Sequence, residues 1–190
     1  FELKMDICPK TCHNFLQLCE YKCYTGSMVN VWPGLLLQGG DFTKLDELVY
    51  SPDDPECFDF ATLLPEVQAG GQSVYGGLFE DESFELKHSG AGVLSMFTAA
   101  PNSNGSQFQI TLSELPKFDG NTVAFGQVVE GFEVLAAISS VGNPAQDGST
   151  FQRVTVEKCG VCSLPPPPPP APISDPKPPS RQTPPPPPPQ

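Results

Sequence analysis

The distribution of proline constrains this chain more than any other feature of its sequence. Of its 24 prolines, 16 lie between Pro165 and Pro189. This stretch has no apolar periodicity and holds Ile173 as its one bulky apolar residue, so it cannot bury enough surface to offset the entropy of becoming ordered. We therefore expect one globular domain over residues 1–164, a length that suits a single core, followed by a disordered proline-rich tail over residues 165–190.

Charge excludes some classes of partner. Residues 1–164 hold 8 of the 10 Lys and Arg residues and 21 of the 22 Asp and Glu residues, which gives this part a net charge of −13. Such a domain repels the phosphates of nucleic acids and anionic lipids, so we expect no nucleic-acid partner. The chain also lacks any run that approaches the roughly 20 apolar residues of a membrane span, so we expect no membrane partner.

The cysteines bear on compartment and on metal binding. Their number is odd and their spacing irregular, which argues against a disulfide framework and favours a reducing, cytoplasmic location. Three pairs leave zinc open as an alternative: Cys8 and Cys12, Cys19 and Cys23, and Cys159 and Cys162. However, Cys12 and Cys19 fall on the apolar stripe of a predicted helix, where free cysteine acts as a small hydrophobe. We expect no metal and no cofactor, and we interpret His13 and His88 as surface or structural residues.

Apolar periodicity predicts two helices. The first covers residues 9–20, with Pro9 at the favourable first helical position and an apolar stripe at i, i+3, i+4 and i+7. The second covers residues 130–139, with Gly142 as its C-terminal stop.

Several short strands are predicted between and around these helices. Their expected ranges are 1–5, 27–37 (a strand pair bent at Pro33-Gly34), 93–97, 108–112, 122–125 and 151–157. Many short strands with two helices indicate a β-barrel capped by helices.

A long polar segment over residues 44–72 interrupts this pattern. It carries seven carboxylates against Lys44, and a loop of this length is usually functional or disordered. We expect an acidic insertion that acts as a partner surface or a lid, or that is solvated and has no role.

Six segments stand out as motifs: PKTCHNF at 9–15, PGLLLQGGDF at 33–42, SVYGGLFEDE at 73–82, PNSNGSQF at 101–108, FDG at 118–120 and VAFG at 123–126. Together they resemble the cyclophilin-type peptidyl-prolyl isomerase family. One such match would be weak, but six in the family's order are specific. The resemblance implies a mainly β fold, an eight-stranded antiparallel barrel capped by two helices. Family members carry about one strand before the position of Phe1, so we expect the first barrel strand to be missing and sheet edges to be exposed.

The resemblance also implies the chemistry. An X–Pro bond isomerises slowly because its C–N bond has partial double-bond character. Catalysis needs a pocket for the ring, anchors for the flanking carbonyl, and a donor that stabilises the twisted amide. In the family an arginine donates to the prolyl nitrogen. Its position here is Asn30, an uncharged and shorter donor, and Arg153 aligns with the last strand, away from the site.

The remaining site positions follow from the same resemblance. The anchors Gln38, as a second catalytic position, and Gln107 are retained. Gln109 replaces a pocket phenylalanine, and on an apolar floor it must find polar partners or stay hydrated. The other expected substrate-binding residues are Leu35, Leu36, Phe97 (which narrows the groove), Thr98, Lys117 (for a rim tryptophan), Phe118 and Thr122 (for a rim histidine). Phe97 and Phe118 also suit ordinary apolar packing, and Lys117 suits a solvent-facing side chain.

We predict a monomeric peptidyl-prolyl isomerase that acts on X–Pro bonds of peptides and proteins in folding, with weakened activity. The alternative, favoured by the number of altered pocket positions, is an inactive peptide- or protein-binding module. The runs Pro165–Pro170 and Pro184–Pro189 should form polyproline II, which SH3, WW and EVH1 domains bind. There are two other interpretations: the tail is a spacer without a partner, or it binds transiently in the groove of its own domain.

Overall fold

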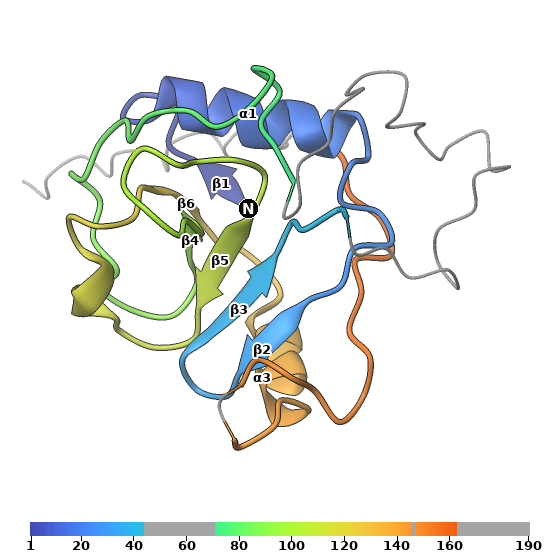
Figure 1. Cartoon of the computed structure of the whole chain (residues 1–190). Coiled ribbons are helices and arrows are strands. Elements are labelled where there is room, and N and C mark those ends of the chain that lie inside the picture. Colours follow the sequence, from blue (N-terminus) through green and yellow to red (C-terminus); the bar gives the residue numbers. More distant parts are fainter. Residues whose placement is uncertain (44–70, 146, 163–190) are drawn as a thin grey trace, which may run out of the picture.

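A computed structural model describes residues 1–43, 71–145 and 147–162 of the chain. In this part, six strands form one antiparallel sheet in the order β1-β6-β4-β5-β3-β2. Helices α1 and α3 lie at opposite ends of the sheet (Figure 1). The predicted proline-rich tail, and the acidic insertion apart from its last two residues, lie outside the described residues.

Helix α1, Pro9–Glu20, confirms the first predicted helix. Proline occupies its first turn, where the missing N–H costs nothing. Its buried side includes Cys12, Phe15 and Cys19. The Phe15 ring lies 5.3 Å from that of Phe108 and 5.4 Å from that of Phe125, so the helix is held to the sheet by aromatic packing.

The predicted strand pair is a hairpin of β2, Asn30–Trp32, and β3, Leu36–Gly39. Its turn contains Gly34 at φ +70°, a conformation that glycine adopts without a Cβ penalty. In this register Asn30 lies opposite Gln38. The bend expected at Pro33-Gly34 is therefore confirmed, and it places two predicted site residues on neighbouring strands.

Three further strands complete the centre of the sheet: β4 (Val93–Met96), β5 (Phe108–Thr111) and β6 (Ala124–Gln127). They confirm the predictions to within about two residues, the usual scatter at strand ends. At one edge, β1 (Glu2–Leu3) pairs with β6. Register shifts between Leu94 and Ser95 where β4 meets β6.

The expected eight-stranded barrel is not what the described residues form. Their named strands number six, and β1 and β2 stand at the two ends of the sheet. The prediction of a regular strand over 151–157 is wrong, because this segment makes one isolated bridge, between Thr155 and Met28. The segment still pairs with its neighbour in places, since Val29 N donates to Val154 O over 2.9 Å. Residues 151–157 do not, however, form a continuous ladder of strand hydrogen bonds.

Helix α3, Phe132–Ser140, confirms the second predicted helix. The helix ends at its C-cap Val141, directly before Gly142, as expected of a glycine stop. Gly142 does not adopt the left-handed conformation common at this position, and it also serves close packing. A Cβ built on it would lie 2.6 Å from Cγ1 of Val31 and 2.7 Å from Cγ of Pro33, so glycine lets the chain after α3 approach the β2–β3 hairpin.

The core lies between the sheet and the helices and is strongly aromatic, with Tyr24 and Phe125 among its fully buried side chains. Six of the seven cysteines fall in the described ranges, and all six are free thiols. No helix of the described residues is both long and apolar enough to cross a membrane. The same residues contain no cluster of three or more His, Cys, Asp or Glu side chains suited to a metal ion.

Candidate functional site

A row of three amide side chains crosses the β2–β3 hairpin toward β5. Asn30 Nδ2 donates to Gln38 Oε1 over 3.2 Å, and Gln38 Nε2 donates to Gln107 Oε1 over 2.7 Å. Asn30 is exposed while Gln38 is buried. The arginine position and the two anchors predicted from the sequence therefore form one hydrogen-bonded unit with its open end at Asn30.

The loop that carries Gln107 is held from several sides. Asn14 on α1 donates to Gly105 O over 2.9 Å, and Tyr24 Oη donates to Ser106 O over 3.0 Å. Both Asn14 and Tyr24 are buried. Hydrogen bonds from two buried side chains to one short loop fix its backbone, and with it the direction of Gln107.

Gln109, which the resemblance predicts to take the place of a pocket phenylalanine, is almost fully buried at 1% exposure and has polar partners. Its Nε2 donates to Ser95 Oγ over 3.0 Å and reaches Thr122 Oγ1 at 3.5 Å. Ser95 lies opposite Gln109 in the β4–β5 register. The requirement stated from the sequence, that this glutamine find partners or stay hydrated, is met by protein groups.

The same network continues from Thr122 to a buried histidine. Thr122 Oγ1 lies 3.3 Å from His88 Nε2, and His88 Nδ1 lies 3.0 Å from Asp119 Oδ1. Because a carboxylate only accepts, His88 Nδ1–H is the donor to Asp119. Hydrogen bonds from the His88 backbone N–H and then from its ring lower the pKa of Asp119 below its ordinary range.

A pocket of about 650 Å³ lies beside this network. Four predicted substrate-binding residues line it: Thr98, Lys117, Phe118 and Thr122. The ammonium of Lys117 lies 5.1 Å from the centroid of the Phe118 ring, so this lysine covers an aromatic face. Asp81 and Asn102 supply polar groups at the same pocket.

Three other predicted substrate-binding residues lie away from this pocket. Leu35 lies in the hairpin turn and is 36% exposed, whereas Leu36 is buried in β3. Phe97 is half-buried, and its backbone N–H donates to Gln107 O over 3.0 Å. All three lie outside the lining of the 650 Å³ pocket. The structure thus brings together an amide row and a rim pocket, joined through β5.

Sequence reasoning missed several residues that position this site. They are Asn14, Tyr24, Asp81, Ser95, and the pair His88 and Asp119. Asp119 lies inside the FDG segment already singled out, so its motif was a usable signal. Asn14 lies in the PKTCHNF segment in the same way. No short sequence pattern predicts the role of Ser95, because that role depends on its place opposite Gln109 in the sheet.

Comparisons with known proteins show the family to which this fold belongs. The model of the cyclophilin-type peptidyl-prolyl cis-trans isomerase family matches residues 1–161. Among solved structures, the chain is similar to a cyclophilin-type peptidyl-prolyl cis-trans isomerase of Cryptosporidium parvum, crystallised in the presence of the dipeptide Ala-Pro. The two are 32% identical with a TM-score of 0.68, over 86% of this chain and 91% of that one.

Proposed function

Because this chain belongs to the cyclophilin-type peptidyl-prolyl cis-trans isomerase family, we propose that it catalyses cis–trans exchange at X–Pro bonds of peptides and proteins, at a reduced rate. The substrate class is supported by the Cryptosporidium relative, whose crystal structure is in the presence of the dipeptide Ala-Pro. Three statements about this chain stay predictions from the sequence: its cytoplasmic location, its monomeric state, and the binding of its tail by SH3, WW or EVH1 domains.

The row Asn30–Gln38–Gln107 is the observation that carries this proposal. An X–Pro peptide at the open end of the row would meet an amide donor at Asn30 and side-chain amides at the two glutamines. Asn30 can donate to the prolyl nitrogen as its lone pair leaves conjugation, without a formal charge. The reduced rate follows from this difference, because a neutral amide donates more weakly than a guanidinium.

A non-catalytic binding module is the second candidate. The observation that favours it is that the Asn30 amide already donates to Gln38 Oε1. One of the two Asn30 N–H groups is used in this bond, and Gln38 thereby holds the other in one direction, so that it can anchor a bound peptide without following the prolyl nitrogen as the amide twists. Binding would then occur without acceleration of exchange.

Exchange spectroscopy by NMR on an X–Pro tetrapeptide separates these candidates. We would compare the unmodified chain with Asn30→Arg and with Asn30→Leu, which removes the donor and adds no charge. A slow isomerase accelerates exchange above buffer, Asn30→Arg raises the rate by at least about 10-fold by analogy with single oxyanion donors, and Asn30→Leu lowers it. Peptide binding with no acceleration by the unmodified chain would favour the binding module.

A further inference from the structure

Lys117, which lines the pocket of about 650 Å³, is a cation whose hydrogen-bond donors are unused. Within residues 1–43, 71–145 and 147–162, no ion pair or hydrogen bond engages its ammonium. The ammonium lies 5.1 Å from the centroid of the Phe118 ring, a contact that attracts the charge but supplies no acceptor oxygen. An ammonium group has three N–H donors, so these are available to a ligand in the pocket.

The carboxylate at the same pocket does not neutralise this charge. Asp81 Oδ2 accepts from the backbone N–H of Asn102 over 2.8 Å, and Asp81 Oδ1 accepts from Asn104 Nδ2 over 2.8 Å. The backbone N–H of Asp81 donates to Asn102 Oδ1 over 3.0 Å. Both carboxylate oxygens therefore hold the loop that carries these asparagines. The positive charge of Lys117 is left to act on a ligand.

The backbone at Lys117 is fixed, although its side chain is exposed. Lys117 lies in a 3₁₀ turn over Pro116–Phe118, and Asn121 Nδ2 donates to Lys117 O over 3.0 Å. The backbone N–H of Asp119 donates to Pro116 O over 3.1 Å. The flexible four-carbon stem of lysine can thus turn its ammonium from the Phe118 ring to a ligand while the chain stays in place.

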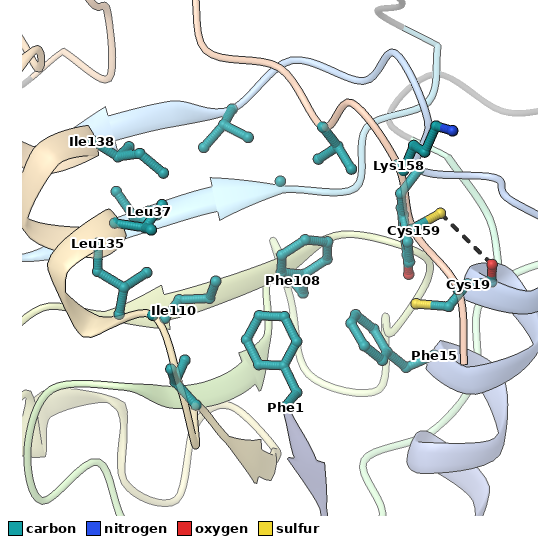
Figure 2. A pocket seen from close by; sticks show the side chains of 18 of the residues that line it. Phe1, Phe15, Cys19, Leu37, Phe108, Ile110, Leu135, Ile138, Lys158 and Cys159 are labelled. Carbon is teal, nitrogen blue, oxygen red and sulfur yellow. Dashed lines mark hydrogen bonds between the residues drawn. The ribbon is translucent and has the colours of Figure 1, made fainter. Parts of the chain in front are cut away.

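The pocket lies on the face of β5 that also carries the inner end of the amide row. Phe108 and Ile110 of β5 point to the opposite face, where they line a separate apolar hollow (Figure 2). Side chains alternate between the two faces of a strand, so Gln107 and Gln109 point away from that hollow. Gln109 Nε2 reaches Thr122 Oγ1 at 3.5 Å, and Thr122 lines the pocket of Lys117.

A second connection joins the amide row to this pocket. The backbone N–H of Phe97 donates to Gln107 O over 3.0 Å, and the next residue, Thr98, lines the pocket. Consecutive Cα atoms are about 3.8 Å apart. A peptide bound at the amide row therefore needs only a few further residues to place a side chain in the pocket.

We propose that Lys117 gives this protein a preference for X–Pro peptides that carry an acidic side chain near the proline. This inference rests on the proposed function, because that function places the peptide at the amide row. The carboxylate of the peptide accepts a charge-assisted hydrogen bond from the Lys117 ammonium. Thr98 and Asn102 supply further polar groups at the same pocket.

The charge of the whole domain acts against this preference but only at long range. Residues 1–164 carry a net charge of −13, which repels an acidic peptide as it approaches. Salt at physiological concentration screens exposed charges beyond about 8 Å. The contact with Lys117 is much shorter than this distance, so the local attraction outweighs the general repulsion once the peptide is bound.

A set of hexapeptides tests the proposal on the full chain. The parent probe consists of alanine with one central proline. Glutamate, glutamine or lysine replaces alanine in turn at each of the two positions before the proline and the two after it. NMR measures the dissociation constant and the rate of cis–trans exchange for each peptide. We expect glutamate to bind about 3-fold more tightly than glutamine at one or more positions, within the range of exposed ion pairs, and lysine to bind less tightly than glutamine.

Three variants assign the preference to Lys117. Lys117→Met keeps an apolar stem over the Phe118 ring and removes the charge, so the glutamate and glutamine peptides should bind equally. Lys117→Glu should invert the order, so that the lysine peptide binds most tightly. Lys158→Glu is the control, because it changes the net charge by the same amount at an exposed lysine beside the separate apolar hollow (Figure 2). It should keep the preference for glutamate.

Three results would overturn the proposal: equal binding of the glutamate and glutamine peptides at all positions, a preference that persists in Lys117→Met, or an equal loss in Lys158→Glu. The exchange rates of the same samples judge the proposed isomerase function separately. Uniform acceleration with every peptide would retain that function and overturn the preference. Glutamate-selective binding without acceleration would support the preference and favour the binding module.

Discussion

The side-chain amide of Gln38 donates to Oε1 of Gln107 over 2.7 Å and so joins β3 to the loop that leads into β5. Gln38 is buried, and it also accepts from Asn30. One glutamine therefore sets the orientation of Asn30, the predicted arginine position, and of Gln107, the second predicted anchor. Changes at Gln38 should act on both partners at once.

Gln38→Met tests this role. Methionine has nearly the same length and shape, but it lacks both hydrogen bonds. The variant also removes the side-chain amide that a bound peptide would meet, and one such hydrogen bond contributes about 0.5–1.5 kcal/mol. We therefore expect X–Pro peptide binding to weaken by roughly 10-fold, measured as a dissociation constant by NMR titration. Gln127→Met, at an exposed glutamine of β6, is the matched control. Unchanged affinity in Gln38→Met would contradict the assigned anchoring role.

Gln109→Leu should destabilise the fold, because it leaves the buried Ser95 hydroxyl without its donor. The expected cost is about 1–3 kcal/mol in the free energy of unfolding, measured with urea. Adding Ser95→Ala removes the unsatisfied group, so the double variant should lose at least about 0.5 kcal/mol less than the sum of the single variants. Strict additivity would show that the two side chains are not energetically coupled.

Sequence reasoning succeeded where the signal was local. The helix over 9–20 follows from Pro9 and an apolar stripe, and the hairpin follows from Pro33-Gly34 with its flanking apolar residues. The strand over 151–157 failed because alternation predicts an extended chain, whereas a regular strand also needs neighbours on its edges. The segment pairs with residues 26–29 through one isolated bridge and single backbone hydrogen bonds.

In the candidate site, too, some residues could be predicted from the sequence and others depended on the tertiary structure. The family resemblance located Asn30, Gln38 and Gln107, and elementary solvation predicted that Gln109 needs partners. The identity of those partners depends on register across β4 and β5 and on the path of residues 116–122. Neither is encoded in a short motif, so Ser95 and His88 emerged from the structure.

Gly142→Ala should destabilise the fold through overpacking. Its added methyl group would lie 2.6 Å from Cγ1 of Val31, inside contact distance, and the segment after α3 would have to move away from the hairpin. We expect a loss of about 1–3 kcal/mol in the free energy of unfolding. Gly90→Ala is the control, since nothing lies within 4 Å of its added atom. Equal stability of the two variants would contradict the close approach at Gly142.

Near neutral pH, Cys159 should be alkylated more readily than the other five thiols of the described residues. A hydrogen bond from the Cys19 thiol, with a further one from Thr25, lowers the pKa of Cys159 from 9.0 to about 6. Because the thiolate is the nucleophile, we expect its reaction with iodoacetamide to reach half of its maximal rate near pH 6. Burial raises the pKa of Cys12 to about 12, so Cys12 serves as the unreactive control in the same peptide map.

The same shift links folding to pH. The folded pKa of Cys159 lies below its unfolded value, so the stability it contributes is fully present above about pH 9 and is lost as the pH falls through about 6. Between these values, the free energy of unfolding should rise with pH more steeply in the unmodified chain than in Cys159→Ser. Urea titrations at pH 6, 7.5 and 9 measure the difference. Parallel pH profiles, or an alkylation midpoint near pH 9, would show that the Cys19 thiol does not stabilise the Cys159 thiolate.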